Sequence, residues 1–198
     1  MNSQTKILLS ELRQNPPVSV EEIERAQTTL GHEFPNDYVE FLRFCNGGEG
    51  FIGETYVIFW RAREVPEFNT LYEVTTYAPG LLLFGSNGGG EAYAFDTRLP
   101  SMATVQVPFV GMDLQETISI APSFNRFLVE LSQKKTLDSK SVFAGEAPYQ
   151  GRELFEIKPV KLGGSPIDRS NKTLLSREQH ISAVNYWNKV ISELKGKR

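Results

Sequence analysis

The sequence predicts an α+β fold, in which an antiparallel β-sheet packs with helices at both chain ends of a core and a C-terminal extension follows. Apolar residues recur at helical intervals near the N-terminus and again after residue 122, whereas the segments between them form short apolar or alternating runs typical of strands. The order of helices, strands and helix lacks the alternation that a parallel sheet requires.

Three helices are expected before the first strand. The first covers residues 3–14 and ends at Asn15-Pro16-Pro17, because proline cannot continue a helix. Ser19 and Glu22 stand in capping-box spacing, so a second helix begins at Ser19 and ends at Gly31.

A third helix follows Pro35 and ends at Asn46-Gly47-Gly48. Its apolar stripe includes Cys45, which we therefore predict to be a small core residue and not a reactive thiol. Because Cys45 is the only cysteine, the chain cannot form an internal disulfide bond.

Changes in the spacing of apolar residues predict the remaining elements of the core. A polar connection containing a short helix near residues 66–76 separates the first strand from the later ones, and a helix closes the core at Pro122–Leu131. The predicted strands are Thr55–Trp60, Leu81–Phe84, Glu91–Phe95 and Val105–Val107.

The glycine-rich segment at residues 85–90 raises the question of a phosphate-binding loop. Such a loop needs a following helix, and in P-loops a Lys-Ser/Thr pair, whereas here a segment with strand periodicity follows. Asn and Gly tolerate the positive φ of tight turns. We therefore interpret the asparagine–glycine segments as structural turns at Asn46, Gly47, Gly48, Asn87, Gly88 and Gly89.

A change in composition divides the chain into a core at residues 1–137 and an extension at residues 138–198. We expect the extension to dock on the core. The extension begins with Gly, Ser and Pro typical of a linker or irregular structure. A strand at residues 155–160, a loop at residues 165–172 and a helix beginning near Ser176 are expected next. The apolar stripe of this helix needs a surface to cover it.

Charge differs between the two parts. Residues 1–137 contain 10 Lys and Arg against 17 Asp and Glu, and residues 138–198 contain 11 against 7. An acidic core disfavours direct nucleic-acid binding and attracts a basic partner, although such charge also serves solubility. No segment has the length of a membrane span or the pattern of a secretory signal, which predicts a cytoplasmic protein without membrane contact.

No catalytic residue, metal site or cofactor is expected. Two histidines and one cysteine do not give a zinc-binding spacing. Glu91 and Asp96 flank one predicted strand, and its parity places them on opposite faces, which disfavours paired acid–base catalysis. The chain has no GxSxG nucleophile motif.

Residues 156–180 resemble the ββα element of HNH nucleases. The matching positions are Pro159, Gly163-Gly164, Asn171 and the helix-borne His180. The upstream histidine that would act as general base or metal ligand is missing, since Glu156-Ile157-Lys158 stand there. We interpret the segment as a structural appendage or a chance likeness, and His180 as a packing or surface residue. A degenerate nuclease element is the less favoured alternative.

The stretch from Ser19 to Gly53 resembles the opening of the SUKH superfamily, the Smi/Knr-type domain. Residues 81–98 resemble its second signature and residues 123–131 its closing helix, so the resemblance covers roughly residues 17–133. The matching motif positions are Glu22-Ile23, Leu30-Gly31, Phe34-Pro35, Tyr38, Phe41-Leu42 and Asn46-Gly47-Gly48. The resemblance implies an antiparallel α+β fold.

The resemblance also implies a function. Bacterial members are typically immunity proteins that bind and block a cognate polymorphic toxin, often a nuclease and encoded by a neighbouring gene, whereas fungal relatives are regulatory interaction proteins. Neither group is characterised by a catalytic centre. The resemblance therefore predicts a non-enzymatic immunity protein, with a regulatory protein-interaction scaffold as the alternative. We predict partner-binding residues among the acidic side chains near the glycine turns, namely Glu49, Glu54, Glu91 and Asp96.

Overall fold

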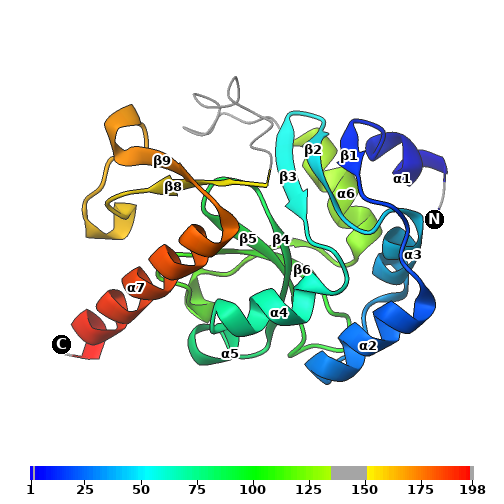
Figure 1. Ribbon diagram of the computed structural model, residues 1–198, viewed down its shortest axis with the longest axis horizontal. Helices are drawn as coiled ribbons and strands as arrows, with labels where there is room; N and C mark the ends of the chain where they lie inside the picture. Colours follow the sequence, from blue (N-terminus) through cyan, green and yellow to red (C-terminus); the bar gives the residue numbers. More distant parts are fainter. Residues whose placement is uncertain (2, 135–150, 197–198) are drawn as a thin grey trace.

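The computed structural model describes residue 1, residues 3–134 and residues 151–196 (Figure 1). A seven-stranded antiparallel sheet has the order β1-β2-β3-β4-β5-β6-β7, so that each strand pairs with the next along the chain, and β8 and β9 form a second, two-stranded sheet. The strands are β1 (Leu12–Gln14), β2 (Gly48–Ile52), β3 (Thr55–Phe59), β4 (Leu81–Ser86), β5 (Glu91–Asp96), β6 (Thr104–Pro108), β7 (Ile118–Ala121), β8 (Glu153–Glu156) and β9 (Lys172–Leu175).

Helices accompany the sheet at both chain ends, which confirms the predicted α+β class. Figure 1 shows α4 in front of the sheet, α6 behind it and α7 beside the C-terminal hairpin. The helices are α1 (Ser3–Leu8), α2 (Val20–Leu30), α3 (Asn36–Phe44), α4 (Glu64–Leu71), α5 (Val74–Tyr77), α6 (Phe124–Gln133) and α7 (Arg177–Gly196), with short 3-10 turns η1 (Leu114–Glu116), η3 (Val160–Leu162) and η4 (Arg169–Asn171).

One face of the sheet packs against α3 and α6 through aromatic rings. Tyr38 of α3 lies 5.1 Å from Phe95 of β5 and 5.0 Å from Phe124 of α6, measured between ring centroids. Phe84 lies 4.4 Å from Phe95. All four rings are fully buried. Each such pair contributes about 1 kcal/mol beyond its buried area, so this cluster is the main core.

A second aromatic cluster carries α4 and α7 on the opposite face. Trp60, directly after β3, meets Phe68 of α4 at 5.0 Å and stacks on Tyr72 at 6.0 Å. Tyr72 in turn lies 4.8 Å from Phe109, and Phe109 lies 4.9 Å from His180 of α7. The C-terminal helix therefore covers rings that belong to the sheet domain.

The predicted first helix is too long. The helix α1 ends at Leu8, and Leu12–Gln14 instead forms the edge strand β1, with Leu12 opposite Gly50 of β2. A short isolated helix is marginal in water, whereas Leu12 is buried when it pairs with the sheet. Ile7 of α1 is 71% exposed.

The predicted helix ends are confirmed where capping residues mark them. Ser19 Oγ accepts a hydrogen bond from the Glu22 amide at 3.3 Å, and Gly31 ends α2 in the left-handed conformation. Ser123 caps α6 in the same way. Before α7, Ser176 and Gln179 exchange backbone–side-chain hydrogen bonds, as in a capping box.

Strands without a clear apolar pattern escaped prediction. β2 begins with Gly48-Glu49-Gly50, and β7 is mostly exposed at the sheet edge, so neither shows strand periodicity. In the extension, the strand expected at residues 155–160 lies at 153–156, because Pro159 and the turn η3 follow, and the expected loop at residues 165–172 ends where β9 begins. The predicted boundary at residues 137/138 falls outside the described residues.

Candidate functional site

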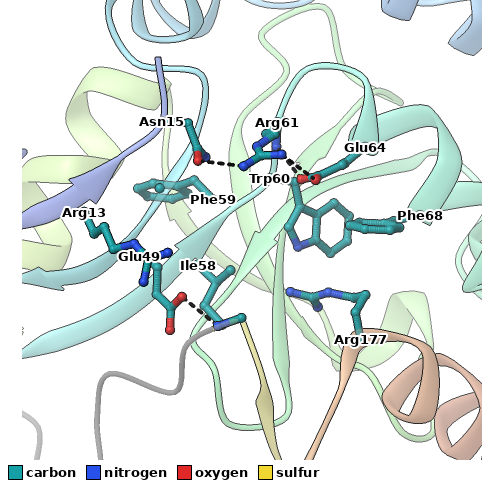
Figure 2. Close-up of a pocket in the computed structure, with 12 residues that line it drawn as sticks. Arg13, Asn15, Glu49, Ile58, Phe59, Trp60, Arg61, Glu64, Phe68 and Arg177 are labelled. Carbon is teal, nitrogen blue, oxygen red and sulfur yellow. Dashed lines mark hydrogen bonds and ion pairs between the residues drawn. The ribbon is translucent and has the colours of Figure 1, made fainter. Parts of the chain in front are cut away.

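A pocket with a volume of about 280 Å³ lies where β1, β2 and β3 meet α4 and the start of α7 (Figure 2). We call it the arginine pocket, because guanidinium groups from three separate elements line it together with aromatic rings. Its lining residues are Arg13, Asn15, Gly48, Glu49, Ile58, Phe59, Trp60, Arg61, Glu64, Phe68, Gly151 and Arg177.

Two of these arginines come from the sheet domain. Arg61 follows Trp60 at the end of β3, and its Nη2 donates a hydrogen bond to Asn15 Oδ1 at 3.1 Å. Its backbone amide donates to Glu64 Oε2 at 2.9 Å, and its Nη1 lies 4.0 Å from Glu64 Oε1, so this carboxylate at the first residue of α4 also forms an ion pair with Arg61. Arg13, on the edge strand β1, has no hydrogen bond or ion pair from its guanidinium to any residue that the structure describes.

Trp60 forms one wall of the pocket. Its indole is 1% exposed, and in Figure 2 it lies between Arg61 and Arg177, with its ring nitrogen turned toward Ile58 and Arg177. Within the described part of the chain, Nε1 has no hydrogen-bond partner. A buried N–H donor without a partner costs about 1–3 kcal/mol, so such groups are rare and call for an explanation.

Arg177 brings the third guanidinium from α7. Its Cζ lies 5.6 Å from the ring centroid of Trp60 and 5.3 Å from that of Phe68, within the range of cation–π attraction. Nη1 pairs with Glu153 Oε1 at 2.6 Å, and Ser86 Oγ donates to the same oxygen at 2.7 Å. Burial lowers the pKa of Arg177, but the charges of and hydrogen bonds to Glu153 and Tyr72 together outweigh this effect, and the net pKa is raised.

His180 completes this buried polar cluster. Its side chain is fully buried, and its Nδ1 lies 2.7 Å from Tyr72 Oη. Burial lowers the pKa of His180 to about 4, an effect that Glu153 opposes and Arg177 reinforces. The imidazole is therefore neutral at pH 7, and it is a packing residue between α7 and the sheet.

The β4–β5 turn binds the C-terminal extension. Asn87 Oδ1 accepts hydrogen bonds from the amides of Gly89 and Glu91, at 2.9 and 3.1 Å, and Gly88 has φ of 67°. The carbonyl of Gly88 accepts a hydrogen bond from the Leu154 amide of β8 at 2.8 Å. The glycine-rich segment thus holds a strand of the extension.

The other asparagine–glycine segment joins α3 to β2. Asn46 is buried, and its Oδ1 accepts a hydrogen bond from the Ala62 amide at 2.8 Å. Gly47 has φ of 76°, and a Cβ there would stand 2.5 Å from the Phe59 carbonyl oxygen. Gly48 is already the first residue of β2. These residues bring Asn15 and Arg61 together beneath the pocket.

The four predicted partner-binding carboxylates do not converge. Glu49 of β2 lines the arginine pocket, and the exposed Glu54 lies in the β2–β3 turn. Glu91 begins β5 and lines a second cleft. Asp96, at the other end of β5, is buried and held by Arg98, which lowers the pKa of the carboxyl.

Glu49 is held within the pocket by two donors. Its Oε1 accepts a hydrogen bond from the Tyr56 hydroxyl, and its Oε2 accepts one from the Gly151 amide at 2.8 Å. Both carboxylate oxygens therefore have partners from the chain itself. The arrangement leaves Glu49 as a fixed wall of the pocket.

The segment that resembles an HNH element does form two strands and a helix, β8, β9 and α7. Asn171 supports the connecting loop: its Oδ1 accepts from the Lys158 amide at 2.8 Å, and its Nδ2 donates to the carbonyls of Lys158 and Ser165. Glu156, where a catalytic histidine would stand, pairs with Lys172 at 2.6 Å. These contacts stabilise the loop.

A second cleft, of about 640 Å³, lies between the extension and the end of the β5–β6 pair where Glu91 faces Pro108. Gly89, Glu91, Glu156, Lys161 and His180 are among the residues that line it. Across residues 3–134 and 151–196, no three His, Cys, Asp or Glu side chains gather as a metal site would require. No helix in the same ranges has the length and apolarity to cross a bilayer.

These features define the class of the protein: it is an antiparallel α+β domain with an arginine-lined pocket and polar loops. The family model of the SMI1 / KNR4 family (SUKH-1) matches residues 17–130, so the chain belongs to this family. A search of curated proteins finds no match. The matched range ends before β8, so Arg177 and the whole C-terminal hairpin and helix lie outside it.

Sequence reasoning did not identify Arg13, Trp60, Arg61 or Arg177 as site residues. The available signal was the pair of arginines, Arg61 and Arg63, directly after an apolar strand. Nothing in the local pattern connects that strand with Arg177, because the two are brought together only by the packing of α7.

Proposed function

We propose that this protein is a non-enzymatic immunity protein, which binds a cognate polymorphic toxin and blocks it stoichiometrically. The observation that carries the proposal is membership of the SUKH-1 family over residues 17–130. Bacterial proteins that share this domain typically neutralise toxins, often nucleases. Binding requires a complementary surface and no catalytic group.

The charge of the sheet domain supports a basic partner such as a nuclease. Residues 1–137 carry 17 acidic against 10 basic side chains, and such a field steers an oppositely charged protein into encounter. Glu54 is exposed in the turn between β2 and β3, and β2 also carries Glu49. We propose that this end of the sheet faces the toxin.

Co-expression with the products of adjacent genes tests the proposal. We expect one neighbour to be toxic, this protein to restore growth, and the two proteins to elute as a stable 1:1 complex. Glu54→Lys should slow association several-fold at low salt, whereas Glu24→Lys, an equal charge change on the exposed side of α2, should not. If no neighbour is toxic and no partner co-purifies, the immunity function is wrong.

A further inference from the structure

The arginine pocket holds more unused hydrogen-bond donors than acceptors. Trp60 Nε1 has no partner and Arg13 makes no ion pair with the described residues. Glu49, by contrast, already accepts with both oxygens, and Glu64 accepts from the Arg61 amide. A ligand that suits this inventory must supply acceptors and negative charge.

We propose that the arginine pocket binds a carboxylate group, and that in the neutralised complex this carboxylate belongs to an Asp or Glu side chain of the partner protein. The second half rests on the proposed function; the first does not. Carboxylates accept bidentate hydrogen bonds from guanidinium groups, and Arg13, Arg61 and Arg177 approach from different sides.

The pocket has room for a side chain. Its volume of about 280 Å³ lies near the lower end of the range of roughly 300–1,000 Å³ typical of small-molecule sites. The rings of Trp60 and Phe68 offer an apolar wall for the methylene groups of an acidic side chain, while the guanidinium groups receive its oxygens.

The arginine pocket within an acidic domain affects how a partner is attracted and then oriented. The overall negative field brings a basic partner close, and one acidic side chain in the pocket then fixes its orientation. A partner without that carboxylate would leave the Arg13 guanidinium without an acceptor, which penalises incorrect partners. The pocket therefore supplies register and specificity.

Indole NMR resonances test carboxylate binding directly. The chain contains two tryptophans, Trp60 and Trp187, so Trp187→Phe leaves one indole N–H signal to follow. Titration with glutarate at constant ionic strength should shift the Trp60 signal saturably. Arg13→Gln should weaken this binding about tenfold, the loss of one charge-assisted hydrogen bond. Arg63→Gln, an exposed arginine outside the pocket, should leave it unchanged.

Three outcomes would overturn the carboxylate assignment. They are a Trp60 signal that does not move, a shift that Arg13→Gln and Arg63→Gln weaken equally, and inorganic phosphate that saturates the pocket more tightly than glutarate. Because Arg13 is exposed on an edge strand, its substitution leaves the fold intact, and the spectrum itself reports that.

A separate experiment tests whether the bound carboxylate belongs to the partner protein. In the rescue assay, Arg13→Gln should weaken protection and complex formation while Arg63→Gln should not. If Arg13→Gln loses glutarate binding but protects fully, the pocket binds carboxylates without contacting the toxin, and the partner assignment is wrong. If no toxin exists, the glutarate titration still decides the pocket.

Discussion

His180 should make the stability of this protein depend on pH. Burial lowers the pKa of the folded imidazole to about 4, with Glu153 opposing this effect and Arg177 adding to it, against an ordinary value of 6.5. Between these values the unfolded chain binds a proton that the folded chain does not. Stability from this residue is therefore full above pH 6.5 and falls as the pH is lowered toward 4, by ~2 kcal/mol at pH 5.

Urea unfolding between pH 8 and pH 5 checks this expectation. His180→Gln should flatten the pH dependence by about the same ~2 kcal/mol, because it removes the titrating group and keeps a neutral hydrogen-bonding side chain near Tyr72. His32→Gln is the control, since His32 is exposed after α2. Parallel pH profiles for His180→Gln and the unaltered protein would show that His180 does not titrate as described.

At this scale the sequence predicts residues whose role is local. Ser19 caps α2 and Gly31 ends it, because both effects depend on neighbours within four positions. Cys45 is buried as predicted, and burial raises the pKa of its thiol to about 12, which makes it unreactive. Arg177 escaped prediction because its partner Glu153 and the rings it covers come from distant parts of the chain.

The connection from α3 to β2 depends on Gly47. Gly47→Ala should destabilise the protein by about 3 kcal/mol or more, because a Cβ would stand 2.5 Å from the Phe59 carbonyl oxygen and 2.7 Å from that of Trp60. Gly31→Ala has a similar φ, 69° against 76°, and no atom within 4 Å, so only about 1 kcal/mol is expected. Thermal or urea unfolding of both variants gives the comparison. Equal losses would mean that the close approach to β3 is relieved by a small shift.

Element prediction succeeded where the pattern of one segment decides the structure and failed where pairing decides it. The strands β3 to β6 have apolar runs that a sheet interior requires, and all four were predicted. β1 and β2 exist because Leu12–Gln14 pairs with Gly48–Gly50, and five of those six residues have no apolar side chain facing a core. Residues 12–14 therefore pair with β2 and do not continue the helix that was predicted through residue 14.

For the whole molecule, residues 151–196 are held to the sheet domain by buried polar contacts. The Asn188 side chain of α7 accepts a hydrogen bond from the Gly111 amide at 2.5 Å and donates one to the Phe109 carbonyl at 3.0 Å. With the pair of Arg177 and Glu153, these groups lie outside the family match yet cover its aromatic rings. We propose that the extension is a docked part of one cooperative unit.

Removal of the extension should therefore damage the sheet domain. A chain ending at residue 137 exposes the side of Trp60, Tyr72 and Phe109 that α7 and β8 cover, and leaves Ser86 without its carboxylate partner. Exposure of such rings costs about 1.5–3 kcal/mol for each one that is fully uncovered. We expect a lower Tm, binding of a hydrophobic dye and loss of the saturable Trp60 shift with glutarate. Asn188→Ala in the full chain should give a smaller loss of about 1–3 kcal/mol, because it leaves two backbone groups unpaired, and Lys189→Ala on the exposed side should be neutral. A shortened chain with the Tm and m-value expected for an intact sheet domain would instead show that residues 1–137 fold independently.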